Sequence, residues 1–223
     1  MIIDMIYTVK QCTEGYENAP SWDTPFWNTV PAAQLCNSMG EQPAHFPKTE
    51  VKMAYDETAL FLMFRVEDRY VRAVAARHQQ SVCGDSCVEF FFSPGPDTGK
   101  GYFNLEMNCG GTLLFHFHPY SDRARSIEIP EADCNRIQCS HSLPRIVNPE
   151  RTEPVTWTIS CRIPLALLGE ALQVRPAPGA LWRGNFYKCA DATSHPHWLT
   201  WAPVDAPRPD FHLPRFFGSL LFC

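Results

Sequence analysis

The residues best suited to chemistry lie on two predicted strands. In Cys87–Phe92 (CVEFFF), Glu89 stands opposite apolar positions, and in Tyr102–Asn108 (YFNLEMN), Asn104 and Glu106 alternate with apolar residues. Because side chains alternate across a strand, these polar groups share one face if the two strands pair. Carboxylates and amides hydrogen-bond vicinal hydroxyl groups, so the pattern predicts a hydroxyl-binding face. A solvated outer face is the simpler interpretation of the same pattern.

The two glutamates, Glu89 and Glu106, also raise the hypothesis of a small glycan-processing hydrolase. Glycoside hydrolysis needs two carboxyl groups about 5 to 10 Å apart that act as acid and base on either side of the scissile bond. Neighbouring strands can supply such a pair, but so can any sheet with two outward glutamates. The sequence has no P-loop, GxGxxG, GxSxG or HExxH motif that would favour another catalytic class.

Aromatic and histidine side chains gather near the C-terminus. Trp198, Phe211 and His212 could lie against the apolar face of a sugar ring while its hydroxyls form hydrogen bonds elsewhere. We expect Trp201 and Phe217 to close the end of the core instead.

Histidines on a predicted strand suggest two further hypotheses. His116 and His118 stand two positions apart and could chelate a metal, although the spacing identifies no third ligand and a polar strand face is the simpler interpretation. His116 could also ligate haem together with Met63 or Met107, as in a related class of β-sandwich domains.

Ten cysteines are present, and none forms a C-x-x-C pair. The nearest spacings, Cys83-x3-Cys87 and Cys134-x4-Cys139, are wider than zinc ribbons and redox motifs require. An even number of cysteines permits disulfides, but we expect buried free thiols. Three cysteines fall inside predicted strands, where a small apolar side chain fits: Cys109, Cys161 and Cys189.

The elements that must position these residues are short strands. The chain has 20 prolines, which interrupt helices, together with 15 Phe, 7 Tyr and 6 Trp, which favour strands. Gly110-Gly111 predicts a hairpin turn, and Ala59–Val66, apolar on both faces, predicts a central strand covered on both sides. Pro164–Leu168 predicts one short helix that ends at Gly169. Alternation and turn residues predict strands at 51–55, 59–66, 87–92, 102–108, 112–118, 156–163, 182–191 and 217–222.

Together these elements predict a single all-β domain over residues 1–223, an antiparallel β-sandwich of jelly-roll or immunoglobulin-like type with one short helix. The long irregular stretches 13–47 and 191–214 are expected to carry function. A net charge of −5 without a Lys/Arg cluster argues against a nucleic-acid partner. No apolar run approaches the roughly 20 residues that a membrane span needs.

The cellular location stays open at this point. Met1-Ile2-Ile3-Asp4 shows neither the basic nor the apolar region of a signal peptide. A cytoplasmic protein and a secreted or periplasmic form with its leader removed would both begin in this way.

Five motifs in order resemble the family 9 carbohydrate-binding modules, from about residue 20 to the end. The likeness is closest to the stand-alone, family 9-like branch, and it implies a β-sandwich that binds sugar without catalysis. It further implies a glucan or xylan chain end, or an oligosaccharide, as ligand, and a glycoside hydrolase as partner in carbohydrate catabolism. The motifs are Trp22-Asp23…Trp27, Asp85–Phe92 (DSCVEFFF), Trp157…Leu165, Asn185–Cys189 (NFYKC) and Asp210-Phe211-His212…Pro214…Phe217-Gly218.

The resemblance also implies site residues. In xylanase-attached members, two tryptophans clamp the sugar, and a glutamate and an arginine bind its hydroxyls. The glutamate falls on Glu89, the arginine at or near Asn104, and one tryptophan on Phe211; the other tryptophan has no aromatic counterpart, and His78 is the nearest flat ring. We therefore expect Glu89 and Asn104 as hydroxyl partners and Phe211 as the stacking platform. The expected neighbours are His78, Glu106, His212 and Trp198.

Two points stay open after this comparison. The family's calcium ligands match no motif here, and Asp23, Asp68 and Asp85 are the candidates for a structural calcium ion. The weakened aromatic clamp leaves a structural domain with a vestigial site as an alternative.

Overall fold

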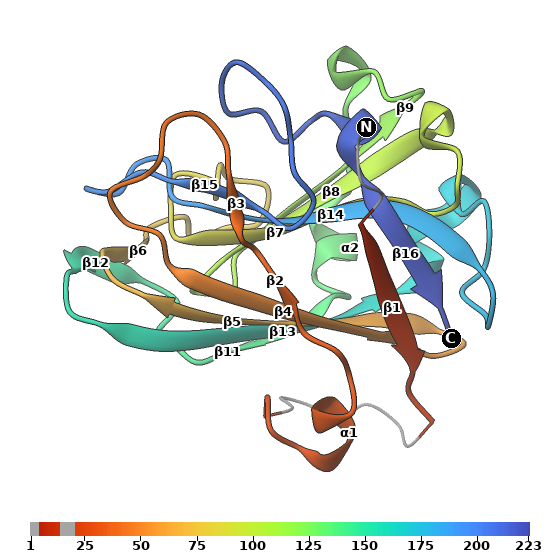
Figure 1. Ribbon diagram of the computed structural model, residues 1–223, viewed down its shortest axis with the longest axis horizontal. Coiled ribbons are helices and arrows are strands. Elements are labelled where there is room, and N and C mark those ends of the chain that lie inside the picture. The colour runs from red at the N-terminus through yellow and green to blue at the C-terminus, as the bar shows by residue number, and fades with distance from the viewer. Residues whose placement is uncertain (1–4, 14–20) are drawn as a thin grey trace.

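The computed structural model describes residues 5–13 and 21–223, and its strands form two layers around an apolar core (Figure 1). Met1–Asp4, whose sequence shows neither region of a signal peptide, lie outside the described residues. Within the described ranges, none of the helices has the length and apolar character needed to span a membrane.

The first sheet carries the predicted polar face. Its strands follow the order β10-β9-β8-β7-β14-β16, and all of these neighbours are antiparallel. Two short strands, β15 and β3, extend it beside β14. The bounds are β3 (Asn37–Ser38), β7 (Cys87–Ser93), β8 (Gly101–Asn108), β9 (Leu113–Pro119), β10 (Ile127–Glu128), β14 (Leu181–Cys189), β15 (Trp198–Thr200) and β16 (Gly218–Phe222).

The second sheet follows the order β4-β5-β13-β11, again antiparallel, with β2 beside β4. A separate pair, β12 with β6, lies at one end. The bounds are β2 (Ala33–Gln34), β4 (Lys48–Tyr55), β5 (Ala59–Asp68), β6 (Val71–Ala73), β11 (Gln138–His141), β12 (Val147–Arg151) and β13 (Val155–Pro164).

One strand, β1 (Ile6–Gln11), belongs to both sheets. Its residues 6–9 pair in parallel with β16, and Lys10 and Gln11 pair in parallel with β4. The two layers are therefore continuous along one edge. The predicted antiparallel β-sandwich is confirmed, with this parallel strand as an addition that the sequence pattern did not predict.

The core lies between the two sheets and holds the apolar face of each strand. Val88, Phe90 and Phe92 of β7 face it, as their alternation predicts. Strand β5 is covered on both faces, because Phe61 and Met63 pack outside the sandwich against the segment that carries Trp22 and Trp27. The prediction of a central, doubly covered strand at 59–66 is confirmed.

Helices are short, and the predicted one stops at Gly169 as expected. Residues 165–171 contain two 3₁₀ turns, and Gly169 between them leaves the helical conformation with a φ of 50°, which suits glycine. Two four-residue α-helices were not predicted: α1 (Pro25–Asn28) and α2 (Glu131–Cys134). The other 3₁₀ turns are Thr98–Lys100, Arg123–Arg125 and Pro214–Phe216.

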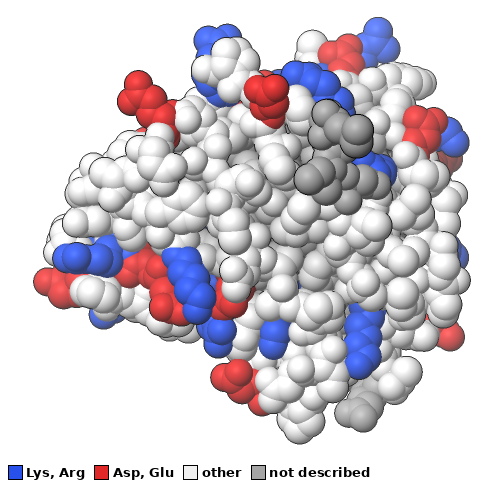
Figure 2. Space-filling view, viewed as in Figure 1, with Lys and Arg blue, Asp and Glu red and all other residues white. Residues whose placement is uncertain are grey.

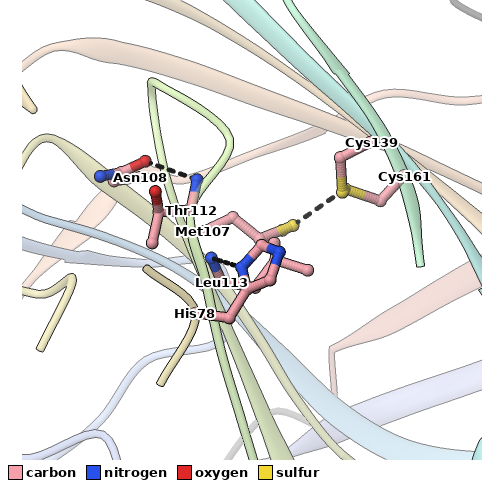
Figure 3. Close-up of a disulfide and its surroundings, with 7 residues drawn as sticks. All are labelled: His78, Met107, Asn108, Thr112, Leu113, Cys139 and Cys161. Atoms are coloured by element: carbon pink, nitrogen blue, oxygen red, sulfur yellow. Dashed lines mark hydrogen bonds between the residues drawn. A yellow bond between two sulfur atoms is a disulfide. The ribbon is translucent and has the colours of Figure 1, made fainter. Parts of the chain in front are cut away.

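The expectation of free thiols is wrong for one pair. Cys139 on β11 and Cys161 on β13 stand opposite in register and form a disulfide (Figure 3). Cys161 therefore does more than fill space in its strand, whereas Cys109 and Cys189 are buried thiols as predicted.

Charged side chains show no segregation by sign on the face drawn in Figure 2. Acidic and basic residues lie mixed around its rim, and its centre holds few of either. This face offers no basic patch for nucleic acid.

Candidate functional site

A pocket of about 370 Å³ opens on the outer face of the first sheet. Strands β7, β8, β9 and β14 supply its floor, and the surrounding loops supply its walls. The floor residues are Glu89, Phe91, Asn104, Glu106, Leu114, His116, His118 and Cys189. The wall residues are Ser81, Cys83, Arg123, Ser126, Asp191, Trp198, Pro209, Asp210, Phe211 and His212.

The pocket gathers all but one of the residues expected from the sequence. Those that line it are Glu89, Asn104, Glu106, Trp198, Phe211 and His212. His78 is not among the lining residues. Its Nδ1 accepts a hydrogen bond from the backbone N–H of Leu113, 3.0 Å away (Figure 3).

The floor places two carboxyl groups side by side. Glu89 on β7 stands opposite Glu106 on β8 in register, and the next pair on the same face is Phe91 with Asn104. The side chains are buried, with exposures of 2% for Glu89 and 7% for Glu106. The interpretation as a solvated outer face is therefore wrong.

The face is buried because loops without regular periodicity cover it. Val82 from one loop and Phe211 from another pack with Phe91 and Tyr187 in a second apolar cluster. This cluster roofs part of the sheet and leaves the pocket beside it. The polar side chains consequently face a pocket that the loops partly cover.

Burial changes the acidity of both glutamates. Burial raises the pKa of Glu89 well above its usual range, and the neighbouring Glu106 carboxyl adds to the effect. Burial also raises the pKa of Glu106 to about 7, although the Asn104 amide partly opposes the shift. Asn104 Nδ2 donates to Glu106 Oε1 at 2.9 Å, and Cys189 Sγ donates to Glu89 Oε1 at 3.0 Å.

A histidine network continues from the floor to the wall. His118 Nε2 donates to Asn104 Oδ1 at 2.8 Å, and the His118 ring stacks on Tyr102, whose hydroxyl lies 2.8 Å from His212 Nδ1. Within the described residues, His118 Nδ1 and His116 Nε2 are buried without hydrogen-bond partners. A bound ligand with hydroxyl groups could satisfy such atoms.

The aromatic walls differ in how much ring they offer. Phe211 stacks on Tyr187 with ring centroids 4.1 Å apart and is only 8% exposed, so one of its faces is already covered. Trp198 is half-buried, and its Nε1 donates to Asp191 Oδ1 at 2.8 Å. Trp201 lies in the core between the sheets, as predicted. Phe217 instead packs in the second apolar cluster on the outer face of the first sheet.

Arg123 is a pocket residue that the sequence did not predict. It comes from the 3₁₀ turn after β9, and its Nη1 lies 3.4 Å from Asp210 Oδ1 on the opposite wall. Asn104 stands near the place where the family resemblance locates an arginine, so Arg123 brings that charge to the pocket from a different element. Because Arg123 lies in a short 3₁₀ turn, no periodic pattern in the sequence predicts which way its side chain points.

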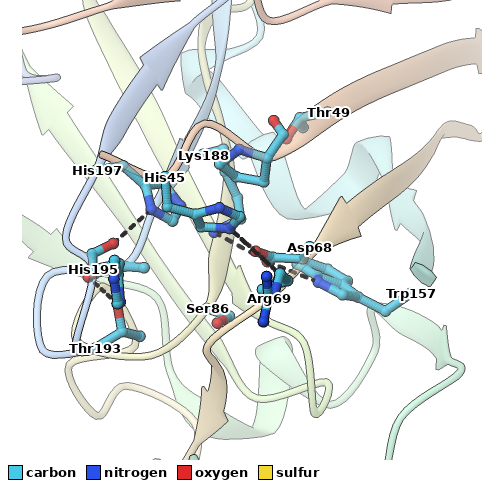
Figure 4. Close-up of polar contacts among 12 residues, drawn as sticks. His45, Thr49, Asp68, Arg69, Ser86, Trp157, Lys188, Thr193, His195 and His197 are labelled. Carbon is cyan, nitrogen blue, oxygen red and sulfur yellow. Dashed lines mark hydrogen bonds and ion pairs between the residues drawn. The ribbon is translucent and has the colours of Figure 1, made fainter. Parts of the chain in front are cut away.

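The three candidate calcium ligands lie in different surroundings. Asp68 Oδ1 accepts hydrogen bonds from His45 Nε2 and the Arg69 backbone, both at 2.8 Å (Figure 4). Asp68 Oδ2 accepts from Trp157 Nε1 at 3.1 Å and lies 3.7 Å from Lys188 Nζ. The positive charge beside the Asp68 carboxylate is therefore the ammonium group of Lys188.

The other two candidates lie elsewhere. Asp85 Oδ2 accepts from the backbone of Val74 and Ala75 and from Asn108 Nδ2, which braces the loop before β7. Asp23 is exposed near α1. Among the described residues, these three aspartates are not gathered into one group of metal-ligating atoms, so they do not share one calcium ion.

The arrangement also bears on the two alternative functions. Met107 packs in the core, with its Sδ 3.3 Å from Cys161 Sγ, while His116 faces the pocket on the other side of the sheet, and Met63 packs outside the second sheet. These side chains cannot ligate one haem. Glu89 and Glu106 lie on the pocket floor as cross-strand neighbours, about 5 Å apart at Cβ, so both carboxyl groups approach a bound ligand from the same side.

Comparison with protein families gives one match over most of the chain. The model of carbohydrate-binding family 9 matches residues 27–222. A curated relative, an extracellular protein of Arthroderma benhamiae, is 21% identical over 182 residues, which is 79% of each chain.

Solved structures show the same fold. A candidate carbohydrate-binding protein from Bacteroides uniformis superposes with a TM-score of 0.84 and 29% identity over 99% of this chain and 100% of that one. Family 9 modules from Caldicellulosiruptor kristjanssonii superpose with a TM-score of 0.66 and 12% identity over 98% of this chain. Their complexes contain cellotriose, where 93% of that chain is covered, and glucose, where 96% is covered.

Proposed function

Since this chain belongs to carbohydrate-binding family 9, we propose that its pocket binds the end of a glucan or xylan chain, or a short oligosaccharide, without catalysis. The observation that carries the proposal is the meeting of Glu89, Asn104 and Glu106 with Trp198 and Phe211 around one space. Sugar recognition combines directed polar groups with an apolar ring face in this way.

The shape of the pocket favours a chain end over the middle of a polymer. Its volume of about 370 Å³ lies near the lower limit for small-molecule sites, about 300 to 1,000 Å³. The wall pair Arg123 and Asp210 closes one side. Relatives of the same fold have been solved with glucose and with cellotriose, which supports gluco-configured sugars as the first ligands to test.

Roles follow from the positions of the side chains. Glu89, Glu106 and Asn104 bind hydroxyl groups from the floor, and the unpartnered His116 and His118 nitrogens add hydrogen bonds. Trp198 is the stacking platform in this proposal, because Tyr187 covers one face of Phe211. A module of this kind serves carbohydrate catabolism by holding sugar beside a glycoside hydrolase.

Calorimetric titration of the intact protein with glucose, cello-oligosaccharides and xylo-oligosaccharides tests the proposal. We expect saturable binding of at least one sugar and its loss or clear weakening in Trp198→Ala. The proposal is wrong if no sugar binds, or if both Trp198→Ala and Glu89→Gln bind with unchanged affinity while remaining folded.

A further inference from the structure

The pocket floor contains a cluster of sulfur and oxygen ligands beside the proposed sugar site. Cys87 on β7 and Cys189 on β14 stand opposite in register, and Glu89 follows on the same face of β7. All three side chains are buried, and one donor atom from each lies within 4.8 Å of the others. No other such trio of His, Cys, Asp or Glu ligands occurs in residues 5–13 and 21–223.

The spacing is close to what a tetrahedral metal needs. Bond lengths of about 2.0 to 2.3 Å for oxygen and sulfur ligands imply ligand atoms about 3.3 to 3.8 Å apart. Cys189 Sγ and Glu89 Oε1 are already 3.0 Å apart. Because the side chains stand on paired strands of one sheet, rotation of the thiol groups changes the distances between the ligand atoms without moving the backbone.

In the part of the chain that the structure describes, no cationic side chain pairs with the carboxyl of Glu89. Among the described residues, its hydrogen-bond donors are the thiols of Cys189 and Cys87, and thiols are weak donors. The nearby Lys188 cannot help, since its side chain points to the other face of the sheet and lies beside Asp68. A bound cation would stabilise a buried carboxyl group that has only weak hydrogen-bond donors and a second carboxyl group opposite it.

We propose that Cys87, Glu89 and Cys189 bind one divalent cation of the zinc class. Two thiolates and a carboxylate suit a borderline-soft ion such as Zn²⁺, whereas Ca²⁺ and Mg²⁺ prefer oxygen ligands alone. Glu89 and Cys189 line the pocket, so the fourth position of the metal faces the pocket and takes water or an oxygen of the pocket's ligand.

Cobalt binding to the intact, reduced protein tests this site without any sugar. Co²⁺ bound by thiolates gives a charge-transfer absorption in the near ultraviolet, and we expect one equivalent to bind and Zn²⁺ to displace it. Cys87→Ser and Cys189→Ser should each weaken binding by about 100-fold or more, since loss of even an outer-shell partner costs about 10- to 100-fold. Glu89→Gln should keep part of the thiolate band with a weaker affinity.

Cys109→Ser is the matched control, because Cys109 is also a buried thiol beside β8 but lies outside the trio. It should bind cobalt like the unaltered chain. Absence of the thiolate band in the reduced protein would overturn the inference, as would an equal band in folded Cys87→Ser and Cys189→Ser. The inference would also be wrong if Cys87 and Cys189 form only a disulfide and the protein takes up no metal after that disulfide is reduced. These readouts do not depend on whether a sugar binds.

Discussion

Lys188 places its ammonium 3.7 Å from the carboxylate of Asp68, and both side chains are buried between the two sheets. Lys188 belongs to β14 in the first sheet and Asp68 to β5 in the second, so the ion pair joins the two layers. His197 Nε2 lies 2.8 Å from the same ammonium and completes the network of Figure 4.

Removing one member of this pair should destabilise the fold. Lys188→Met leaves Asp68 as an uncompensated buried charge, and breaking a buried pair in this way costs about 3 to 5 kcal/mol. Urea unfolding should show the loss, and Lys188→Met combined with Asp68→Asn should recover part of it. The control is Lys48→Met, whose pair with Glu67 is exposed to solvent and should therefore contribute little to stability. Equal effects of Lys188→Met and Lys48→Met would contradict this interpretation.

Acid should weaken the fold through Asp68. Burial opposes its ionisation, but Lys188 and the hydrogen bonds from His45 and Trp157 outweigh burial and lower its pKa from 3.8 to about 2. A depressed folded-state pKa contributes stability above the unfolded-state value, and this stability is lost as the pH falls from about 4 to 2, an effect of about 2 kcal/mol. Unfolding free energy measured against pH should fall less steeply in Asp68→Asn over that window. Identical slopes would show that Asp68 is not the group responsible.

Neutral histidines should add to acid sensitivity at higher pH. Burial, with a smaller contribution from positive neighbours such as Arg123, lowers the pKa of His118 to about 4 and that of His212 to about 3. The unfolded chain then binds more protons below pH 6.5, so stability should decline as the pH falls from about 6.5 to 4. His212→Gln should flatten this part of the profile, whereas His141→Gln, at an exposed residue outside the pocket, should leave it unchanged.

The two aromatic walls should respond differently to truncation. Trp198→Ala should weaken sugar binding by roughly tenfold with little loss of stability, because a stacked ring contributes about 0.5 to 1.5 kcal/mol beyond area burial. Phe211→Ala should reduce stability by about 3 kcal/mol or more, because its ring is packed on Tyr187. Calorimetry and urea unfolding separate the two effects, with Phe46→Ala, at a partly exposed ring outside the pocket lining, as the control. The reverse ranking would make Phe211 the platform.

The floor glutamates should matter for binding more than for folding. Glu89→Gln and Glu106→Gln keep the shape of the side chain but replace one carboxyl oxygen with an amide nitrogen, so sugar affinity should fall by up to about tenfold, as for an ordinary hydrogen bond of about 0.5 to 1.5 kcal/mol. Glu67→Gln, at an exposed residue on the second sheet, should bind sugar normally. Retained affinity in both floor variants would remove these acids from the site.

Alternation along the strands predicted much of the fold and the floor of the pocket. The pattern CVEFFF puts Glu89 and Phe91 on one face, YFNLEMN puts Asn104 and Glu106 on one face, and in-register pairing brings the two faces together. Such local patterns carry the side-chain direction because the period of a strand is two.

Contacts between distant segments could not be predicted in the same way. The loops that cover the pocket floor have no periodic sequence pattern. From the sequence alone, the polar face is therefore predicted to be exposed to solvent. Arg123 reaches the pocket from a 3₁₀ turn, and Cys139 meets Cys161 only because of the register between β11 and β13. The sequence also has no local feature that pairs Asp68 with Lys188.

Strand β1 gives the sandwich an unusual mechanical property. Because it pairs with β16 and then with β4, a pulling force applied at its start loads both layers at the same time. Residues 6–9 run parallel to β16 and residues 10–11 run parallel to β4, so a pull along β1 loads these hydrogen bonds in shear. A surface tether attached ahead of Ile6 would thus hold the molecule through a strand that both sheets share.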